Sequence, residues 1–254
     1  MSPALTDALG AANDADIHVA LVDKVEAPRS LPTLHAMPEN VSSRFDSDEE
    51  LVAAVRSYTR GEMFAGAQET RTTILCCTDS RRDACCARHG FATYKALVAA
   101  ADPERINVVQ ATHIGGCRFA ASLMVLPSRQ RYGRMRPDDA VPFLDAIGNG
   151  EIYLEAYRGR ADAPEAAQVA ELAAMRWAVD HGLPTTSPIL EAKPRTANSV
   201  DQLWVEATLP GAVLSIRLRA QDFFVQGNCD IASRGEGKIT PRWVLDDIEA
   251  TSAS

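Results

Sequence analysis

The chain has 254 residues and a formal net charge of −8 at neutral pH. It is long enough for one large domain or two smaller ones with a packed core. The acidic balance argues against a general nucleic-acid binder, which usually presents a basic surface. No apolar run approaches the roughly 20 residues that span a bilayer, so the sequence predicts no membrane segment.

The first residues lack the basic and apolar segments of a signal peptide, so a cytoplasmic location is expected by default. In that compartment the six cysteines are not expected to form a disulfide framework. All but one of them fall between Cys76 and Cys117, and Cys229, far from the others in sequence, is expected to be structural. Clustered cysteines of this kind indicate a metal centre or thiol chemistry.

Strand and helix patterns alternate along the first 150 residues. Residues 1–15 are rich in Ala and Asp and are expected to be disordered or loosely ordered. The predicted elements that follow are a strand over 16–23, a helix over 46–60, a strand over 72–78, a helix over 86–101, a strand over 105–112, a hairpin over 121–135 and a helix over 137–150. Asp46 or Ser47 is expected to cap the first helix.

This order predicts an α/β fold for residues 16–150, with a mixed, partly parallel sheet flanked by helices in a thioredoxin-like layer arrangement. Sites in open α/β sheets form where strands end and the strand order switches. The loop over 77–86 and the loop over 113–117 each follow a predicted strand. If those strands are parallel neighbours, both loops emerge at the same edge of the sheet.

The remaining residues, 151–254, are predicted to form a C-terminal α+β extension. Its predicted elements are a strand over 151–159, a helix over 163–182 and two strands over 202–209 and 212–220. This region contains no recognisable motif, so we expect an accessory region without a defined role.

The two loops carry four candidate metal ligands: Cys77, Cys86, His113 and Cys117. Iron–sulfur clusters are held by thiolates, with imidazole as the usual substitute, from loops that wrap a small inorganic core. From spacing alone these four residues form a plausible set of three cysteines and one histidine.

Four neighbouring residues bear on that set. Gly115 and Gly116 let the backbone approach closely and offer N–H groups to sulfur. Cys76 and Cys85 compete with their neighbours as ligands, but free cysteines pack as small hydrophobic residues, so both are expected to be core or supporting thiols.

Two segments together resemble the sucrase/ferredoxin-like family of thioredoxin-like ferredoxins: CTDSRRDACCARHG, 77–90, and THIGGCRFAASLMVLPSRQRYGR, 112–134. The residues that match the family motifs are Cys77, Arg82, Asp83, Cys85, Cys86, His113, Gly115, Gly116, Arg118, Phe119, Ala120, Pro127, Tyr132, Gly133 and Arg134. The resemblance implies a [2Fe-2S] cluster held by two cysteines of the first motif and two residues of the second.

The resemblance favours Cys77 over Cys76 and Cys86 over Cys85 as ligands. Cys117 stands where the second cluster histidine is usual in the family. Three thiolates and one neutral imidazole give a centre less negative than an all-cysteine one. We therefore expect a reduction potential above that of all-cysteine ferredoxins and below that of a matched relative with two histidines.

Arg82 and Arg118 have two interpretations. Either their positive charges partly offset the negative charge of the cluster, or they are ordinary surface charges, with Arg82 in a local ion pair with Asp83.

The leading functional hypothesis is a soluble [2Fe-2S] electron carrier or redox sensor rather than an enzyme. Electrons would enter and leave by docking to an unidentified redox partner protein. One alternative is a structural zinc site with three cysteines and one histidine. A second is a thiol–disulfide redox protein on a thioredoxin-like scaffold, although the chain has no Cys-x-x-Cys motif.

Overall fold

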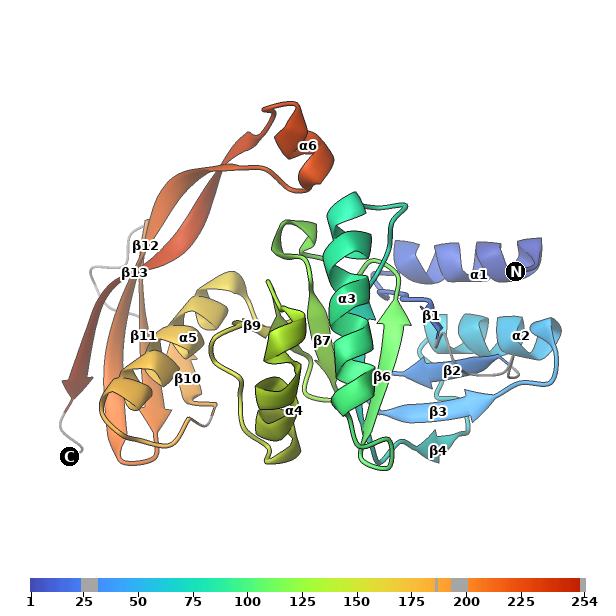
Figure 1. Cartoon of the computed structure of the whole chain (residues 1–254), viewed down its shortest axis with the longest axis horizontal. Coiled ribbons are helices and arrows are strands. Elements are labelled where there is room, and N and C mark those ends of the chain that lie inside the picture. Colours follow the sequence, from blue (N-terminus) through green and yellow to red (C-terminus); the bar gives the residue numbers. More distant parts are fainter. Residues whose placement is uncertain (24–31, 186, 193–200, 252–254) are drawn as a thin grey trace.

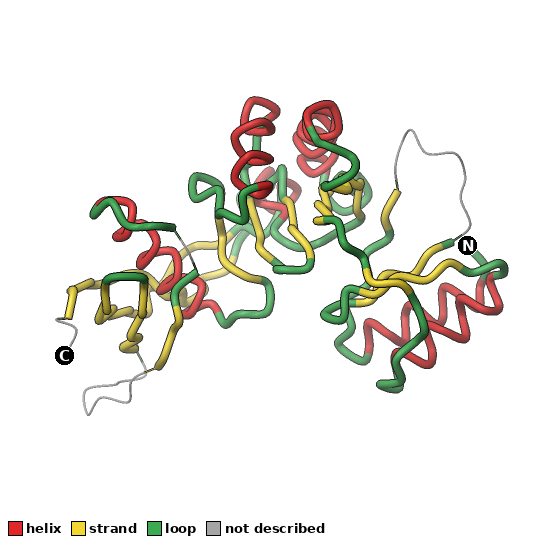
Figure 2. The backbone as a smooth tube through the Cα atoms, turned by 90° about the horizontal axis from the view of Figure 1, so that it is seen from below, coloured by secondary structure: helices red, strands yellow, loops and turns green. Residues whose placement is uncertain are grey.

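The computed structural model describes residues 1–23, 32–185, 187–192 and 201–251. These residues contain three β-sheets: a six-stranded sheet in the middle, a three-stranded sheet near the N-terminus and a four-stranded sheet in the C-terminal part (Figure 1). Figure 2 shows the central sheet between the other two. Within the described ranges, no helix is both long and apolar enough to cross a bilayer.

The central sheet is built on a βαβ unit followed by a ββα unit. In chain order its main elements are β5 (Thr72–Cys77), α3 (Ala84–Ala100), β6 (Ile106–Ala111), β7 (Leu123–Leu126), β8 (Gln130–Tyr132) and α4 (Ala140–Gly148). β5 and β6 are parallel, whereas β7 pairs antiparallel with both β5 and β8. This order, β6-β5-β7-β8, is the thioredoxin-like topology, and it confirms the predicted mixed α/β fold with flanking helices.

Short strands close both edges of the central sheet. β1 (Val22–Asp23) pairs with β6, and it is much shorter than the strand predicted over 16–23. β9 (Tyr157–Arg160) pairs with β8, so the sheet continues beyond the predicted boundary at residue 150. Gly159 gives this last strand its turn toward the following helix, because its φ is +91° and a Cβ there would lie 2.6 Å from the Gln168 side chain.

The two faces of β5 pack into different apolar clusters. Ile74 and Cys76 face the cluster that α3 and α4 cover. Leu75 and Cys77 belong to a second cluster, near the end of the strand. Because successive side chains of a strand point to opposite faces, the two adjacent cysteines have different surroundings.

The N-terminal segment is helical, which differs from the loose order predicted for residues 1–15. Helix α1 (Pro3–Asp14) begins at Ser2, whose side chain accepts a hydrogen bond from the Leu5 N–H. Leu5, Ala8 and Ala12 have helical spacing and pack against α2 (Asp48–Thr59). The long-range contact with α2 stabilises a helix that local composition alone does not predict.

Helix α2 confirms its prediction, and Ser47 is its capping residue. The small sheet beside it was not predicted, since its strands are very short and the first two lie on either side of Pro38. They are β2 (Thr33–Ala36), β3 (Val41–Arg44) and β4 (Ala67–Gln68).

The C-terminal part packs helix α5 (Glu165–Asp180) on an antiparallel sheet, as the predicted α+β extension requires. Its strands are β10 (Ile189–Ala192), β11 (Gln202–Leu209), β12 (Ala212–Val225) and β13 (Lys238–Thr251). Small side chains of the helix, Ala170, Ala174 and Ala178, lie in one fully buried cluster with Leu214 and Ile216 of β12.

β12 and β13 extend beyond this sheet as a long hairpin that carries the short helix α6 (Cys229–Ser233) at its far end (Figure 1). We call residues 222–240, which form the outer end of this hairpin, the arm tip. The sequence predicted neither β13 nor α6.

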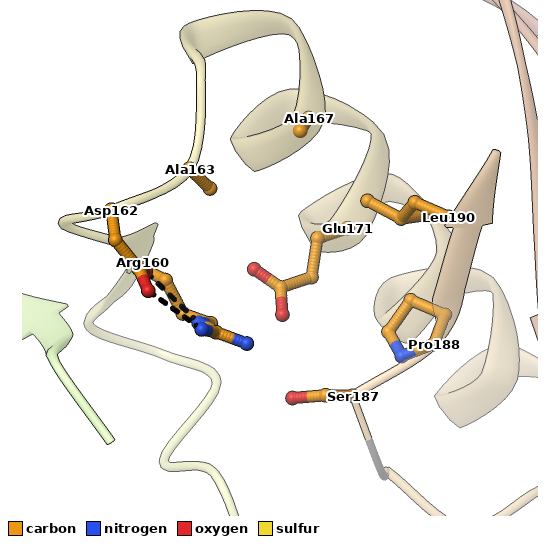
Figure 3. A pocket seen from close by; sticks show the side chains of 8 residues that line it. All are labelled: Arg160, Asp162, Ala163, Ala167, Glu171, Ser187, Pro188 and Leu190. Atoms are coloured by element: carbon orange, nitrogen blue, oxygen red, sulfur yellow. Dashed lines mark hydrogen bonds and ion pairs between the residues drawn. The ribbon is translucent and has the colours of Figure 1, made fainter. Parts of the chain in front are cut away.

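A small pocket lies where the central sheet meets the C-terminal part (Figure 3). The Glu171 side chain points into it, and an ion pair between Arg160 and Asp162 forms the opposite wall. Glu171 is 5% exposed, and the Tyr157 hydroxyl donates a hydrogen bond of 2.9 Å to its carboxylate. Burial raises the pKa of Glu171 above its ordinary value.

We expect Glu171→Gln to change how stability depends on pH. Between the ordinary pKa and the raised folded-state pKa, the folded protein holds more protons than the unfolded chain, so the free energy of unfolding falls as pH rises through that window. The amide carries no titrating charge, so the variant lacks this fall while its oxygen still accepts the Tyr157 hydrogen bond. Urea unfolding from mildly acidic to neutral pH measures the difference.

Glu151→Gln, at an exposed position after α4, is the control and should keep the wild-type pH profile. A stability difference between Glu171→Gln and wild type that is the same at every pH would contradict the assignment.

Candidate metal centre

The first candidate loop begins where β5 ends at Cys77. One carboxylate oxygen of Asp79 accepts hydrogen bonds from the N–H groups of Arg81 and Arg82, at 3.1 and 3.3 Å. The other oxygen accepts the N–H of His113, at 3.3 Å. Asp79 therefore fixes the first loop internally and joins it to the second loop.

Asp83 ends this loop and begins α3. Its side chain caps the helix by accepting the Cys85 N–H at 2.8 Å, and the residue is only 6% exposed. The cap places Cys86 in the first turn of α3, buried in the same apolar cluster as Cys77. A carboxylate is a favourable cap here because it also interacts with the positive end of the helix dipole.

The second loop turns sharply after β6 because Gly115 and Gly116 both have left-handed φ angles, +86° and +79°. They lead into a short 3-10 helix, η1 (Cys117–Phe119). The Arg131 guanidinium donates a hydrogen bond of 2.8 Å to the Ile114 carbonyl and lies so close to Gly115 that a Cβ there would collide with it.

The structure brings all four predicted ligand residues together at one edge of the central sheet. Cys77, Cys86 and Cys117 are buried in one apolar cluster, each less than a tenth exposed. The Cys86 thiol is hydrogen bonded to the sulfurs of both Cys77 and Cys117. The His113 Nδ1 lies 3.4 Å from the Cys117 Sγ.

Hydrogen bonding and burial set the protonation of these groups. The Cys86 thiol, followed by the N–H groups of Asp79 and Ile114, lowers the pKa of Cys77 to about 6, against the effect of burial. As the donor in that bond, Cys86 has a raised pKa. Burial raises the pKa of Cys117 and lowers that of His113.

The Arg82 charge lowers the pKa of His113 further. The site therefore favours one thiolate and a neutral imidazole, the forms in which these side chains bind metals.

Cys76 lies apart from this group, on the opposite face of β5. Its thiol donates a hydrogen bond of 3.3 Å to the Gly90 carbonyl, and burial raises its pKa to about 12. This placement agrees with the expected role of a core thiol.

Cys85 and Cys229 form a disulfide, which neither residue's prediction anticipated. Cys85 is therefore not the free thiol beside the ligands that the sequence predicted. Cys229, although distant in sequence, lies next to the first motif in the fold. Asp83 joins them, because its second carboxylate oxygen accepts the Cys229 N–H at 2.9 Å. No local sequence pattern predicts this contact, since it depends on the unpredicted arm that returns the chain to α3.

Three arginines surround the ring of Phe119, next to Cys117. The guanidinium carbons of Arg118, Arg134 and Arg158 lie 4.7, 5.6 and 3.2 Å from the ring centre. Burial and then the neighbouring arginines lower the pKa of Arg158 to about 10, and no carboxylate is among the charges that shift it. Arg158 lies outside both sequence motifs, so sequence reasoning missed it.

Comparison with known proteins supports the family resemblance. The family model described as sucrase/ferredoxin-like matches residues 14–159. None of the curated proteins matches the chain.

Two solved structures are similar to part of this chain. A thioredoxin-like [2Fe-2S] ferredoxin from Aquifex aeolicus is 16% identical, with a TM-score of 0.34 over 38% of this chain and 97% of that one. A second structure of the wild-type ferredoxin from that organism is 15% identical, with a TM-score of 0.32 over 36% of this chain and 100% of that one.

We expect Gly115→Ala to destabilise the protein more than Gly61→Ala does. Gly61 has almost the same left-handed φ, +83°, but has nothing within 4 Å of an added Cβ. Alanine costs about 1–2 kcal/mol at either position for its backbone conformation alone. At Gly115 it also displaces Arg131 from the Ile114 carbonyl, which adds about 1 kcal/mol or more.

Chemical unfolding of the two variants measures this difference. Equal losses of stability would show that the Arg131 contact does not constrain the loop.

Proposed function

Because the chain belongs to the sucrase/ferredoxin-like family, we propose that it is a one-electron carrier or redox sensor with a [2Fe-2S] cluster held by Cys77, Cys86, His113 and Cys117. The observation that carries this proposal is the convergence of three thiols and one imidazole from two loops at the end of a parallel strand pair. When bound, such a cluster takes up and releases a single electron.

The arrangement of the donor atoms supports two metal ions rather than one. Each loop supplies one pair of donors, Cys77 with Cys86 and His113 with Cys117, and the Cys86 thiol joins the two pairs through its hydrogen bond to Cys117. Four ligands of a single zinc ion lie roughly 3–4 Å from one another. In the described part of the chain, no three of these four donor atoms lie within 4.8 Å of one another. A mononuclear zinc site is therefore the weaker alternative.

The surrounding residues suit a sulfur-rich, negatively charged group. The N–H groups of Asp79 and Ile114 donate to the Cys77 sulfur, as expected of backbone around cluster sulfur. The apolar cluster keeps water away from the three thiols. Arg82 places a positive charge near the second donor pair, since its charge acts to lower the pKa of both His113 and Cys117.

This arrangement supports electron exchange by contact with a partner protein. Cys117 begins η1, and Arg118 and Phe119 complete it, so a partner that contacts the exposed Arg118 would also lie next to the second donor pair. The partner itself is proposed only as a redox protein that docks at this surface.

We expect anaerobically purified protein to be red-brown and to contain about two irons and two acid-labile sulfides per chain. Serine substitution at Cys77, Cys86 or Cys117, or alanine at His113, should reduce the iron content and the visible absorbance. Cys76→Ser is the matched control, because serine keeps the hydrogen bond to Gly90 in a position away from the donors. A colourless zinc protein, or equal iron loss in the control, would overturn the proposal.

Cys117→His should raise the reduction potential, by the order of 100 mV, because a neutral imidazole replaces a thiolate and makes the centre less negative. The visible spectrum should shift as well. Potentiometric titration with optical detection measures both. If neither the potential nor the spectrum changes, Cys117 is not a ligand.

A further inference from the structure

The arm tip has few attachments to the rest of the protein. In the described ranges, its polar contacts with the rest of the chain are the Cys85–Cys229 disulfide and the hydrogen bond from the Cys229 N–H to Asp83. Helix α6 has no buried residue, and the arm tip contributes no side chain to the four apolar clusters. The disulfide is therefore the main connection that holds the arm tip against the start of α3.

We propose that Cys85 and Cys229 form a second redox site, a reversible dithiol–disulfide pair whose reduction releases the arm tip from α3. The site is distinct from the four donor residues, and it takes two electrons where a [2Fe-2S] cluster takes one. Its reductant is a dithiol, either a small molecule or a dithiol protein.

The reaction is ordinary thiol–disulfide exchange. A thiolate of the reductant attacks one sulfur of the pair, the Cys85–Cys229 bond breaks, and a mixed disulfide forms. The second thiol of the reductant, as its thiolate, then attacks the reductant's own sulfur in the mixed disulfide. That bond breaks, the reductant leaves as an internal disulfide, and the second protein sulfur is released as a thiolate that takes up a proton. The protein gains two electrons and two protons and ends with two free thiols.

Exposure distinguishes this pair from the other cysteines. Cys85 and Cys229 are both partly exposed. In contrast, Cys76, Cys77 and Cys86 are each at most 1% exposed. A dithiol can therefore reach the pair without unfolding the core. Partly exposed disulfides are more readily reduced than buried ones and are commonly the regulatory ones.

Release follows from what remains after reduction. One hydrogen bond to the Asp83 carboxylate is then the remaining polar contact, and it must offset the entropy of holding the whole arm tip in place. Phe224 and Ile239, which face each other across the hairpin, are 57% and 66% exposed and add no packing against α3. The reduced arm tip is therefore expected to open.

The position of the pair gives this opening a consequence for the proposed metal centre. Cys85 directly precedes Cys86, and Asp83 caps the helix that carries both. In the disulfide form the arm tip lies beside the first candidate loop, and in the dithiol form that surface is uncovered. This consequence rests on the proposed function, whereas the redox site itself does not.

Hydrogen exchange of the full-length protein, read by mass spectrometry with and without dithiothreitol, tests the proposal. Non-reducing peptide mapping should show Cys85 joined to Cys229, and dithiothreitol should make two further thiols available for alkylation. Exchange over residues 222–240 should then accelerate by about tenfold or more, because the disulfide no longer restricts local opening of the arm tip. Exchange in β5 should not change.

Cys229→Ser should show fast exchange in the arm tip before any reductant is added, and Cys85→Ser should behave in the same way. Slow exchange in the arm tip after complete reduction, or a bound metal that bridges the two sulfurs, would overturn the proposal. The iron content of the same samples keeps the two proposals separate. Faster exchange in the arm tip on reduction, in protein without iron, would support the disulfide proposal alone. Iron in protein whose arm-tip exchange does not change on reduction would support the cluster alone.

Discussion

The parallel pairing of β5 with β6 is the constraint on which the rest of the site depends. Cys77 lies opposite Ala111 in that register, so the two strands end together and both candidate loops leave the sheet at one edge. Asp79 can then join the loops by accepting the N–H of His113. Without this pairing, the thiols of one motif and the imidazole of the other would have no reason to meet.

Much of this arrangement was predictable from sequence because it depends on local patterns. Apolar strands, a helix after the first motif and a Gly-Gly turn in the second predict that the two loops meet at one edge of the sheet. Strand alternation also separates Cys76 from Cys77, which now have pKa values shifted in opposite directions. The disulfide was not predictable, since it joins residues 144 positions apart through strands whose pairing has no local signature. Helix α1 was missed for a similar reason, because it is stabilised by α2.

Electrostatics explain why a buried group of thiols is tolerated in an acidic chain. Hydrogen bonds from backbone N–H groups stabilise the Cys77 thiolate, and the Arg82 charge acts to lower the pKa of Cys117 and of His113. The same residues would stabilise the negative charge of an iron–sulfur cluster. Asp83 is negatively charged and has a structural role, because it caps α3 and accepts a hydrogen bond from the Cys229 N–H. The two proposed redox sites thus share one helix terminus while differing in electron number and exposure.

The Mössbauer spectrum of protein produced with enriched iron tests the central claim most directly. Three cysteines and one histidine shared between two irons predict two distinct iron environments in equal amounts, one with sulfur ligands alone and one with a nitrogen ligand. On reduction, the extra electron should localise on the iron that carries the histidine. A single iron environment, or iron without bridging sulfide, would contradict the account.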